Sequence, residues 1–511
     1  MTIGSAWVVV VVVASEACAG VHSSPVGGAG GANAGTGTGG SAGSAGGRSG
    51  GVRPDGGVKV GGCQGLQCQQ TTCTQGACAQ TPCAPGAKTT LSGTVYDPAG
   101  RTPLYNIIVY VPNAPLGAIT DGVTCDKCDG TATGSPIASA LTDPAGHFAI
   151  DNAPVGSNIP MVIQVGKWRR EVSIPSISAC VDNPVADPSL LRLPRNQAEG
   201  HIPQMALTTG HADALECLLR KIGVSDSEFT VDSGAGRVHM YYGGDLSGPA
   251  GGGAGANVFT SALGGAGFSS AKTLWGDPIK LMKYDLLLLS CEGGQYASAK
   301  MPYLANIKAY ADSGGRMFTD HLHFYWLNHG PAPWPMTANY IGVGSDLPTP
   351  FVSTIDQTFP KGIAFAQWLV KVGATTAPVA GAPETISILQ GQYSVQGTIP
   401  PYTQRWIYAD HNPNDSAMRP AVEYMTMNTP AELAATMPAN QCGRVVFTDL
   451  HVVSAGTAAT QDTSHPGTAF PLGCVTTGDL SPQEKALEFM LFDLSSCVQP
   501  ESVPPVPPVI P

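Results

Sequence analysis

Two stretches of this 511-residue chain decide its fold: GGRMFTDHLH at residues 314–323 and CGRVVFTDLH at residues 442–451. Each carries a Gly-Arg pair, continues as a short apolar run and closes on aspartate and histidine. Strands that are apolar throughout are typical of a parallel sheet covered by helices on both faces. The two stretches therefore predict an α/β domain in which acid and imidazole side chains follow two of the strands.

The flanking sequence extends this α/β pattern. Further strands are expected at 205–210, 284–290 and 421–427, and helices near 212–222, 302–312 and 362–372. The best-marked helix follows Ser481 as N-cap, with Pro482 at its first position and Glu484 completing a capping box. We place this domain at residues 203–498, with a Pro/Gly/Thr-rich insertion at 375–420 and a Pro-rich tail at 499–511.

The order of these elements, with a Gly-Gly strand and a late Gly-Arg-Val strand, resembles the class I glutamine amidotransferase-like superfamily and its ThuA-like branch. The resemblance implies a flavodoxin-like parallel sheet. It also implies a nucleophilic cysteine in a tight elbow after the Gly-Gly strand. The matching position here, residues 318–321, holds no cysteine, which argues against glutaminase chemistry.

Ligands of such sheets bind beyond the carboxyl ends of the strands, so the residues that follow each strand are the candidate site. They are Cys291 and Glu292 after the strand at 284–290, Asp320, His321 and His323 after the strand at 316–320, and Asp449 and His451 after the strand at 443–449.

One interpretation is a metal site for zinc or a similar divalent ion. The nitrogen ligands would come from His321 or His323 and from His451. The oxygen ligands would come from Asp320 and Asp449. Side-chain alternation puts Asp449 and His451 on one face if their strand continues, whereas Asp320 and His321 point apart unless the chain turns at His321.

A second interpretation is a cysteine hydrolase. Cys291 would attack the substrate, with His321 or His451 as the base, and Glu292 or Asp449 would orient that base. A disulfide at Cys291 would exclude this chemistry.

Residues 88–195 alternate apolar and polar side chains with turn residues between them, as a β-sandwich does. The segments SGTVYDPAG at 92–100 and TDPAGHFAI at 142–150 resemble the carboxypeptidase regulatory-like domain, an immunoglobulin-like or transthyretin-like fold. The resemblance implies a non-catalytic accessory module on an exported protein. A long loop at about 113–139 departs from the pattern, and its Cys125 and Cys128 are expected to form a local disulfide.

The first 87 residues predict export. Residues 1–18 resemble a signal peptide that ends at a lipid-attachment cysteine, Cys18. Residues 19–62 form a Gly/Ser/Ala-rich spacer, and residues 63–87 carry a cysteine every five residues from Cys63 to Cys83. With 14 cysteines, the chain suits an oxidising compartment. The Cys-rich segment is expected to be a disulfide knot or stalk, its odd fifth thiol pairing elsewhere.

Composition limits the partners. Only 12% of residues are charged and the net charge is -11, which excludes nucleic acid as a partner. The whole arrangement resembles a family of exported myxobacterial proteins that combine these two domains.

We expect a secreted or outer-membrane surface protein that meets an extracellular ligand or a cell-envelope component. Its α/β domain would bind a ligand, with carbohydrate as the candidate, through Asp320, His321, Asp449 and His451. The alternative is a metal-assisted hydrolase or lyase acting on extracellular glycan or peptide. A bridged Cys291 with scattered acids and histidines would favour ligand binding, and an accessible thiol or a bound metal would favour the hydrolase or lyase.

Overall fold

The computed structural model describes residues 80–507 except 129, 131, 211, 244–266, 343, 376–383, 453–469, 471–473 and 475–477. The leader with Cys18, the spacer and the cysteines from Cys63 to Cys78 lie outside these residues. Within the described part of the chain, no helix combines the length and apolar character needed to cross a bilayer.

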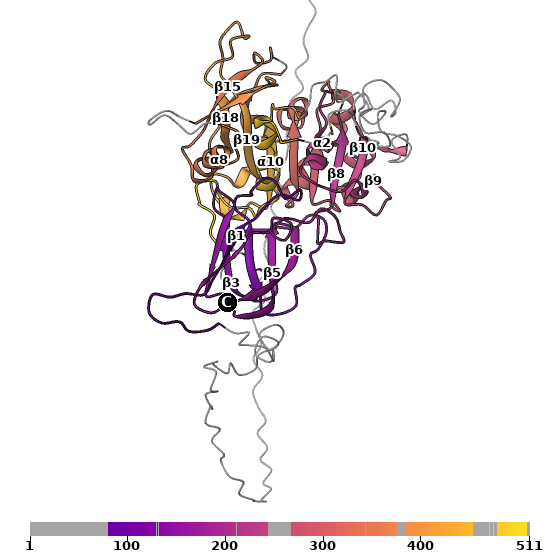
Figure 1. The fold of residues 1–511 in the computed structure, drawn as a ribbon. Coiled ribbons are helices and arrows are strands. Elements are labelled where there is room, and N and C mark those ends of the chain that lie inside the picture. Colours follow the sequence, from indigo (N-terminus) through magenta and orange to yellow (C-terminus); the bar gives the residue numbers. More distant parts are fainter. Residues whose placement is uncertain are drawn as a thin grey trace, which may run out of the picture. The chain divides into compact units, whose positions relative to one another are not determined.

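The chain has a mixed α/β fold with several sheets, and its first described part is built from two small ones (Figure 1). One sheet has the order β4-β1-β7 and the other the order β3-β2-β5-β6. The strands are β1 (Thr90–Thr94), β2 (Ile108–Pro112), β3 (Pro136–Leu141), β4 (His147–Asp151), β5 (Gly156–Val165), β6 (Trp168–Ile177) and β7 (Asp182–Val185). Alternate residues of β3 and β4 are buried, as the sequence pattern predicts.

An 11-stranded sheet forms the second part, in the order β11-β10-β8-β12-β13-β20-β19-β18-β15-β16, with β9 beside β10. Its strands are β8 (Met205–Thr209), β9 (Phe229–Val231), β10 (Val238–Tyr242), β11 (Ser269–Ser270), β12 (Leu286–Leu289), β13 (Arg316–Asp320), β15 (Phe351–Ile355), β16 (Thr385–Ile388), β18 (Thr403–Ala409), β19 (Ala421–Thr429) and β20 (Gly443–Thr448). A separate pair consists of β14 (Ala338–Tyr340) and β17 (Val395–Thr398).

Seven of the eleven strands of the large sheet form its parallel half, and the other four pair antiparallel. The strands from β11 to β20 run parallel, whereas β19, β18, β15 and β16 pair antiparallel. The segment between β18 and β19 is too short for a crossover, so these strands form an antiparallel hairpin. The segment expected as an insertion, 375–420, supplies three described strands, two of which extend the large sheet.

Helices cover both faces of the parallel half, because its strands alternate between two apolar cores. Leu286 and Leu288 of β12 belong to one core, and Leu287 and Leu289 belong to the other. The helices are α2 (Leu215–Lys221), α3 (Ala271–Trp275), α4 (Pro278–Leu281), α5 (Ala297–Lys300), α6 (Leu304–Asp312), α7 (Phe324–His329), α8 (Pro360–Lys371) and α10 (Pro482–Ser495). Short 3-10 helices are η1 (Asp226–Glu228), η4 (Met301–Tyr303), η5 (His321–His323), η6 (Trp334–Met336), η7 (Ala431–Leu433) and η8 (Pro438–Asn440).

The last helix, α10, begins as predicted. The Ser481 side chain accepts a hydrogen bond from the Glu484 backbone N–H, and the Glu484 carboxylate accepts one from the Ser481 N–H. This reciprocal pair satisfies two of the backbone donors that a helix N-terminus leaves free.

Disulfides link the loop that follows β2 to the α/β part. Cys125 pairs with Cys442 and Cys128 pairs with Cys497, so the prediction of a local bond between Cys125 and Cys128 is wrong. Further disulfides join Cys83 to Cys180 and Cys217 to Cys474. Cys83 is the fifth cysteine of the Cys-rich segment, and its bond to Cys180 agrees with the prediction that this cysteine pairs with one outside the segment.

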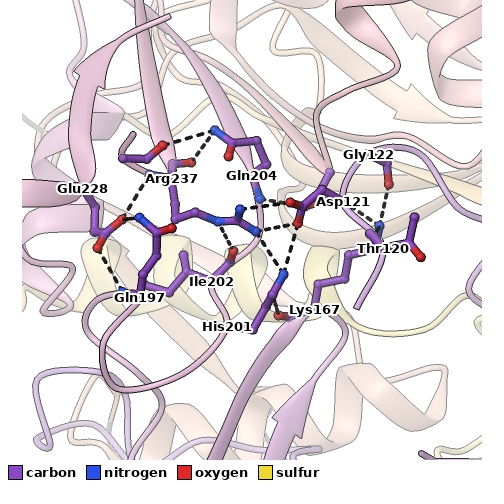
Figure 2. Close-up of polar contacts among 12 residues, drawn as sticks. Thr120, Asp121, Gly122, Lys167, Gln197, His201, Ile202, Gln204, Glu228 and Arg237 are labelled. Carbon is purple, nitrogen blue, oxygen red and sulfur yellow. Dashed lines mark hydrogen bonds and ion pairs between the residues drawn. The ribbon is translucent and has the colours of Figure 1, made fainter. Parts of the chain in front are cut away.

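Ion pairs reinforce the same junction (Figure 2). The Asp121 carboxylate accepts hydrogen bonds from the Arg237 guanidinium at 2.6 and 3.1 Å, and His201 Nε2 lies 3.0 Å from the same carboxylate. Lys167, in the turn between β5 and β6, reaches Asp285 at 2.6 Å. The segment between β2 and β3, with Asp121, Cys125 and Cys128, therefore ties the first described part of the chain to the part that carries the large sheet.

Candidate functional site

Three parallel strands, β12, β13 and β20, bring the candidate site together. They are neighbours in the sheet, so their carboxyl ends meet at one edge. Cys291 follows β12, His321 follows β13 and His451 follows β20. These three buried residues form a group whose ligand atoms all lie within 4.8 Å of one another. A buried Cys/His/His group of this kind could hold a metal ion.

The distances within the group suit one metal ion. Cys291 Sγ lies 3.4 Å from His321 Nδ1. Two ligands on a tetrahedral zinc ion, with bonds of about 2.3 Å to sulfur and about 2.0 Å to nitrogen, would lie about 3.5 Å apart. His451 Nε2 is buried and has no hydrogen-bond partner within the described residues, so it is available to a ligand. His321 would bind the ion through Nδ1, which lies beside Cys291 Sγ; its Nε2 is also unpaired within the described residues but cannot bind the same ion.

A tight turn at His321 makes this arrangement possible. The chain leaves β13 and enters η5 through His321, whose φ of 39° lies in the left-handed region that side-chain-bearing residues rarely adopt. From the sequence, we expected the two Asp-His segments to share one geometry only if the chain turned at His321. The structure has this turn. The imidazole thereby sits beside Cys291 of the neighbouring strand.

Asp320 contacts the backbone of Cys291 and lies near His451. Its Oδ2 accepts a hydrogen bond from the Cys291 backbone N–H at 3.0 Å, and its Oδ1 lies 3.8 Å from His451 Nε2. Burial raises the pKa of Asp320 well above its usual value, and the adjacent Asp213 carboxyl raises it further. Asp213 in turn accepts the Val452 N–H at 2.8 Å and so fixes the segment that carries His451.

The electrostatics disfavour a free thiolate. Burial raises the pKa of the Cys291 thiol well above its usual value, and the Asp320 carboxylate adds to the shift. Burial lowers the pKa of His321 and that of His451. The cluster therefore holds a neutral thiol beside neutral imidazoles, not the thiolate–imidazolium pair of a cysteine hydrolase. Neutral imidazole is the form that binds metal ions, and coordination deprotonates a thiol.

Two of the sequence candidates for metal ligands point elsewhere. His323 places Nε2 2.9 Å from the Ser290 carbonyl oxygen, and its Nδ1 accepts a hydrogen bond from Trp326 Nε1 at 3.0 Å. Asp449 accepts hydrogen bonds from the Ser394 backbone N–H and hydroxyl at 2.7 to 2.9 Å. Burial raises the pKa of Asp449 to about 7.

Glu292 is an ion-pair partner. Its Oε2 lies 2.7 Å from Lys300 Nζ, and both side chains are wholly buried. Its Oε1 lies 3.8 Å from His323 Nε2. Glu292 and His323 thus belong to a polar layer behind Cys291, while the cluster faces the other way.

The cluster opens into a cavity of about 490 Å³. Cys291, His321 and His451 line it, together with Asp346, the segment around Gly391 and Leu347. Of the cysteines that the structure describes, Cys291 alone is outside a disulfide. A ligand in the cavity would therefore meet the thiol and both imidazoles at once.

The sequence predicted Cys291 as a nucleophile with His321 or His451 as its base, and the histidines as metal ligands, but not all three residues as ligands of one ion. The available signal was that three strands of a predicted parallel sheet each end in chemically active residues; that these strands are neighbours is seen only in the structure. Asp213, Asp346 and Glu423 were not identified, because none stands directly after a predicted strand: Asp213 lies four residues beyond the end of β8, Asp346 lies between β14 and β15, and Glu423 lies within β19.

Comparison of the sequence with models of known protein families finds no match, and neither does comparison with curated proteins. One similar solved structure, described as a GMP synthase component from Thermoplasma acidophilum, is 8% identical. That match covers 58% of this chain and 95% of that chain, with a TM-score of 0.27. A type II cohesin–X-dockerin complex from Acetivibrio cellulolyticus is 20% identical, with a TM-score of 0.13; the match covers 20% of this chain and 56% of that chain, little more than half of its length. Scores this low establish no shared fold.

Proposed function

We propose that Cys291, His321 and His451 bind one divalent metal ion, with zinc as the best candidate, and that the protein is a metal-assisted hydrolase or lyase. The observation that carries the proposal is the convergence of one thiol and two imidazoles on a cavity that reaches all three. Three protein ligands with an open position are typical of catalytic zinc sites, whereas structural sites are closed by a fourth.

The residues around the cluster support this chemistry. Asp320 fixes the backbone of Cys291 by accepting a hydrogen bond from its N–H, and its other carboxylate oxygen lies 3.8 Å from His451 Nε2. The turn at His321 holds its ring beside the sulfur. A metal ion held there would supply a Lewis acid that polarises a carbonyl and activates water. The cavity would hold the substrate beside Cys291, His321 and His451.

The alternatives from the sequence fit less well. Scattered acids and histidines, together with a disulfide at Cys291, would have favoured a ligand-binding role without metal. In the structure Cys291 is outside any disulfide, and both histidines lie beside it. Cysteine hydrolysis needs an ionised thiol, which the buried surroundings of Cys291 oppose.

For the rest of the chain we propose export and a surface location, either secreted or anchored to the outer membrane through Cys18. The β-sandwich is the accessory module that its resemblance to carboxypeptidase regulatory-like domains implies. The large sheet is the scaffold that its resemblance to class I amidotransferase-like proteins implies. Substrates would then be extracellular glycan or peptide.

Metal uptake by the purified full chain tests the proposal. After exposure to zinc or cobalt and desalting, we expect about one ion per chain, and a thiolate-to-cobalt charge-transfer absorption in the cobalt form. Cys291→Ser should lose that absorption, and His321→Ala/His451→Ala should lose the ion. His411→Ala, at an exposed histidine, is the matched control. Wild-type protein that binds no ion would leave a metal-free ligand-binding protein as the better account.

A further inference from the structure

The cavity in front of the Cys/His/His cluster is lined by an acidic side chain. Among the described residues that line it, Asp346 is the one carboxylate, and none is lysine or arginine. The Gln392 side-chain amide lies 3.2 to 3.3 Å from the Asp346 carboxylate and can donate to it. Within the described part of the chain, no lysine or arginine pairs with Asp346.

A second carboxylate lies directly behind the cavity wall. Glu423, on β19, is completely buried, and neither carboxylate oxygen has a hydrogen-bond partner in the part of the chain that the structure describes. Gly391 lines the cavity, and a Cβ at that position would lie 3.0 Å from Glu423 Oε2. Glu423 therefore lies next to Gly391, which with Leu347 lines the cavity.

The surroundings of Glu423 favour its neutral, protonated form. Burial raises its pKa well above the usual value, and the carboxylates of Asp449 and Asp346 raise it further. A buried carboxyl group without hydrogen bonds is costly, so a protein that retains one needs a reason. A cation in the cavity would stabilise the ionised forms of Asp346 and Glu423, because a low-dielectric cleft strengthens the attraction.

We infer that the cavity recognises a substrate that carries a protonated amine. The ammonium group would lie at Asp346, against the wall formed by Gly391 and Leu347, with the Glu423 carboxylate behind it. The inference rests on the proposed function, because the other end of the substrate would reach the Cys291, His321 and His451 cluster. Substrates with a carboxylate or phosphate at that position would be repelled.

Matched probes of three charges test the inference. Each is an alkyl hydroxamate, which chelates a metal ion at one end, and carries an ammonium, a hydroxyl or a carboxylate at the other. Chains of two to six carbons cover the span of the cavity. Affinities for the cobalt-loaded full chain are measured by titration calorimetry, with cobalt absorption as a check that the hydroxamate reaches the ion.

At the best chain length we expect the ammonium probe to bind about fivefold more tightly than the hydroxyl probe, as for a partly exposed ion pair. The carboxylate probe should bind most weakly. Asp346→Asn should reduce the ammonium preference to less than twofold, and Glu423→Gln should reduce it in part. Glu171→Gln, which removes one exposed carboxylate of the β-sandwich, should leave it unchanged.

Two results would overturn the inference: equal affinity for the ammonium and hydroxyl probes, or a preference that survives in Asp346→Asn. If the protein takes up no metal, the proposed function fails and the inference is tested separately. In that case, hexylamine, hexanol and hexanoate are compared on the metal-free chain by ligand-observed NMR. Binding of the amine alone, lost in Asp346→Asn, would uphold it, and equal or absent binding would reject it.

Discussion

Replacing Lys300 with methionine should destabilise the protein strongly, because it isolates a buried charge. Lys300 Nζ lies 2.7 Å from Glu292 Oε2, and both side chains have zero exposure. Lys300 also lies over the Trp326 ring, 5.9 Å from its centroid. Methionine keeps the length of the side chain but leaves Glu292 without its counter-ion. Removing one partner of a buried pair costs about 3–5 kcal/mol of unfolding free energy.

Urea unfolding followed by tryptophan fluorescence measures this loss. The double variant Lys300→Met/Glu292→Gln removes both charges and should recover at least about 2 kcal/mol of it, because a neutral pair needs no solvation by water. Lys88→Met is the control, since its pair with Asp151 is 61% and 51% exposed and should contribute less than about 1 kcal/mol. Lys300→Met within about 1 kcal/mol of wild type would refute the reasoning, as would a double variant less stable than the single one.

Three further predictions concern the rest of the fold. Mass mapping of the unreduced protein should find Cys125 joined to Cys442 and not to Cys128; a peptide with the 125–128 bond would contradict the fold at this loop. Ser481→Ala should lower the unfolding free energy by about 1 kcal/mol in urea, because it removes the cap of α10, and an unchanged midpoint would count against the capping box. Burial raises the pKa of Asp97 to about 6 from 3.8, so the folded state binds this proton more tightly than the unfolded state. The contribution of Asp97 to stability should then fall as pH rises from about 4 to about 6, by at most about 3 kcal/mol; the difference between the wild-type profile and that of Asp97→Asn measures it, and a contribution that rises with pH would have the wrong sign.

The sequence predicted local structure well where a short segment carries its own signal. The strand Arg316–Asp320 has the predicted bounds, and the capping box at Ser481 and Glu484 is confirmed. Both features depend on residues a few positions apart. The parallel pairing of β12, β13 and β20 matches the parallel sheet predicted from apolar runs between helices, but the order of the strands was not predicted.

Side-chain direction beyond the strand ends could not be predicted. β20 ends at Thr448, so alternation no longer relates Asp449 to His451, and Asp449 turns to Ser394 of a distant segment. His323 follows the turn at His321 and is directed to Ser290. The direction of each depends on contacts with residues far away in sequence, which no local period encodes.

Pairing between residues far apart in the sequence could not be predicted either. The bond between Cys128 and Cys497 spans 369 residues, and spacing alone favoured the neighbouring cysteine. The antiparallel half of the sheet was missed for a related reason. Its strands are as apolar as the parallel ones, so composition does not reveal their direction.

The two disulfides of the loop after β2 turn most of the chain into a closed covalent ring. Cys125 and Cys128 lie three positions apart, whereas their partners Cys442 and Cys497 are separated by the segment that carries His451 and α10. A protease that cuts once between Cys128 and Cys442 would open the ring without releasing a fragment. The nicked protein would keep both halves of the cluster on one molecule until a reductant severed the bonds. Outside the cell, where peptide bonds are attacked more readily than disulfides are reduced, such a ring tolerates damage that would divide an open chain.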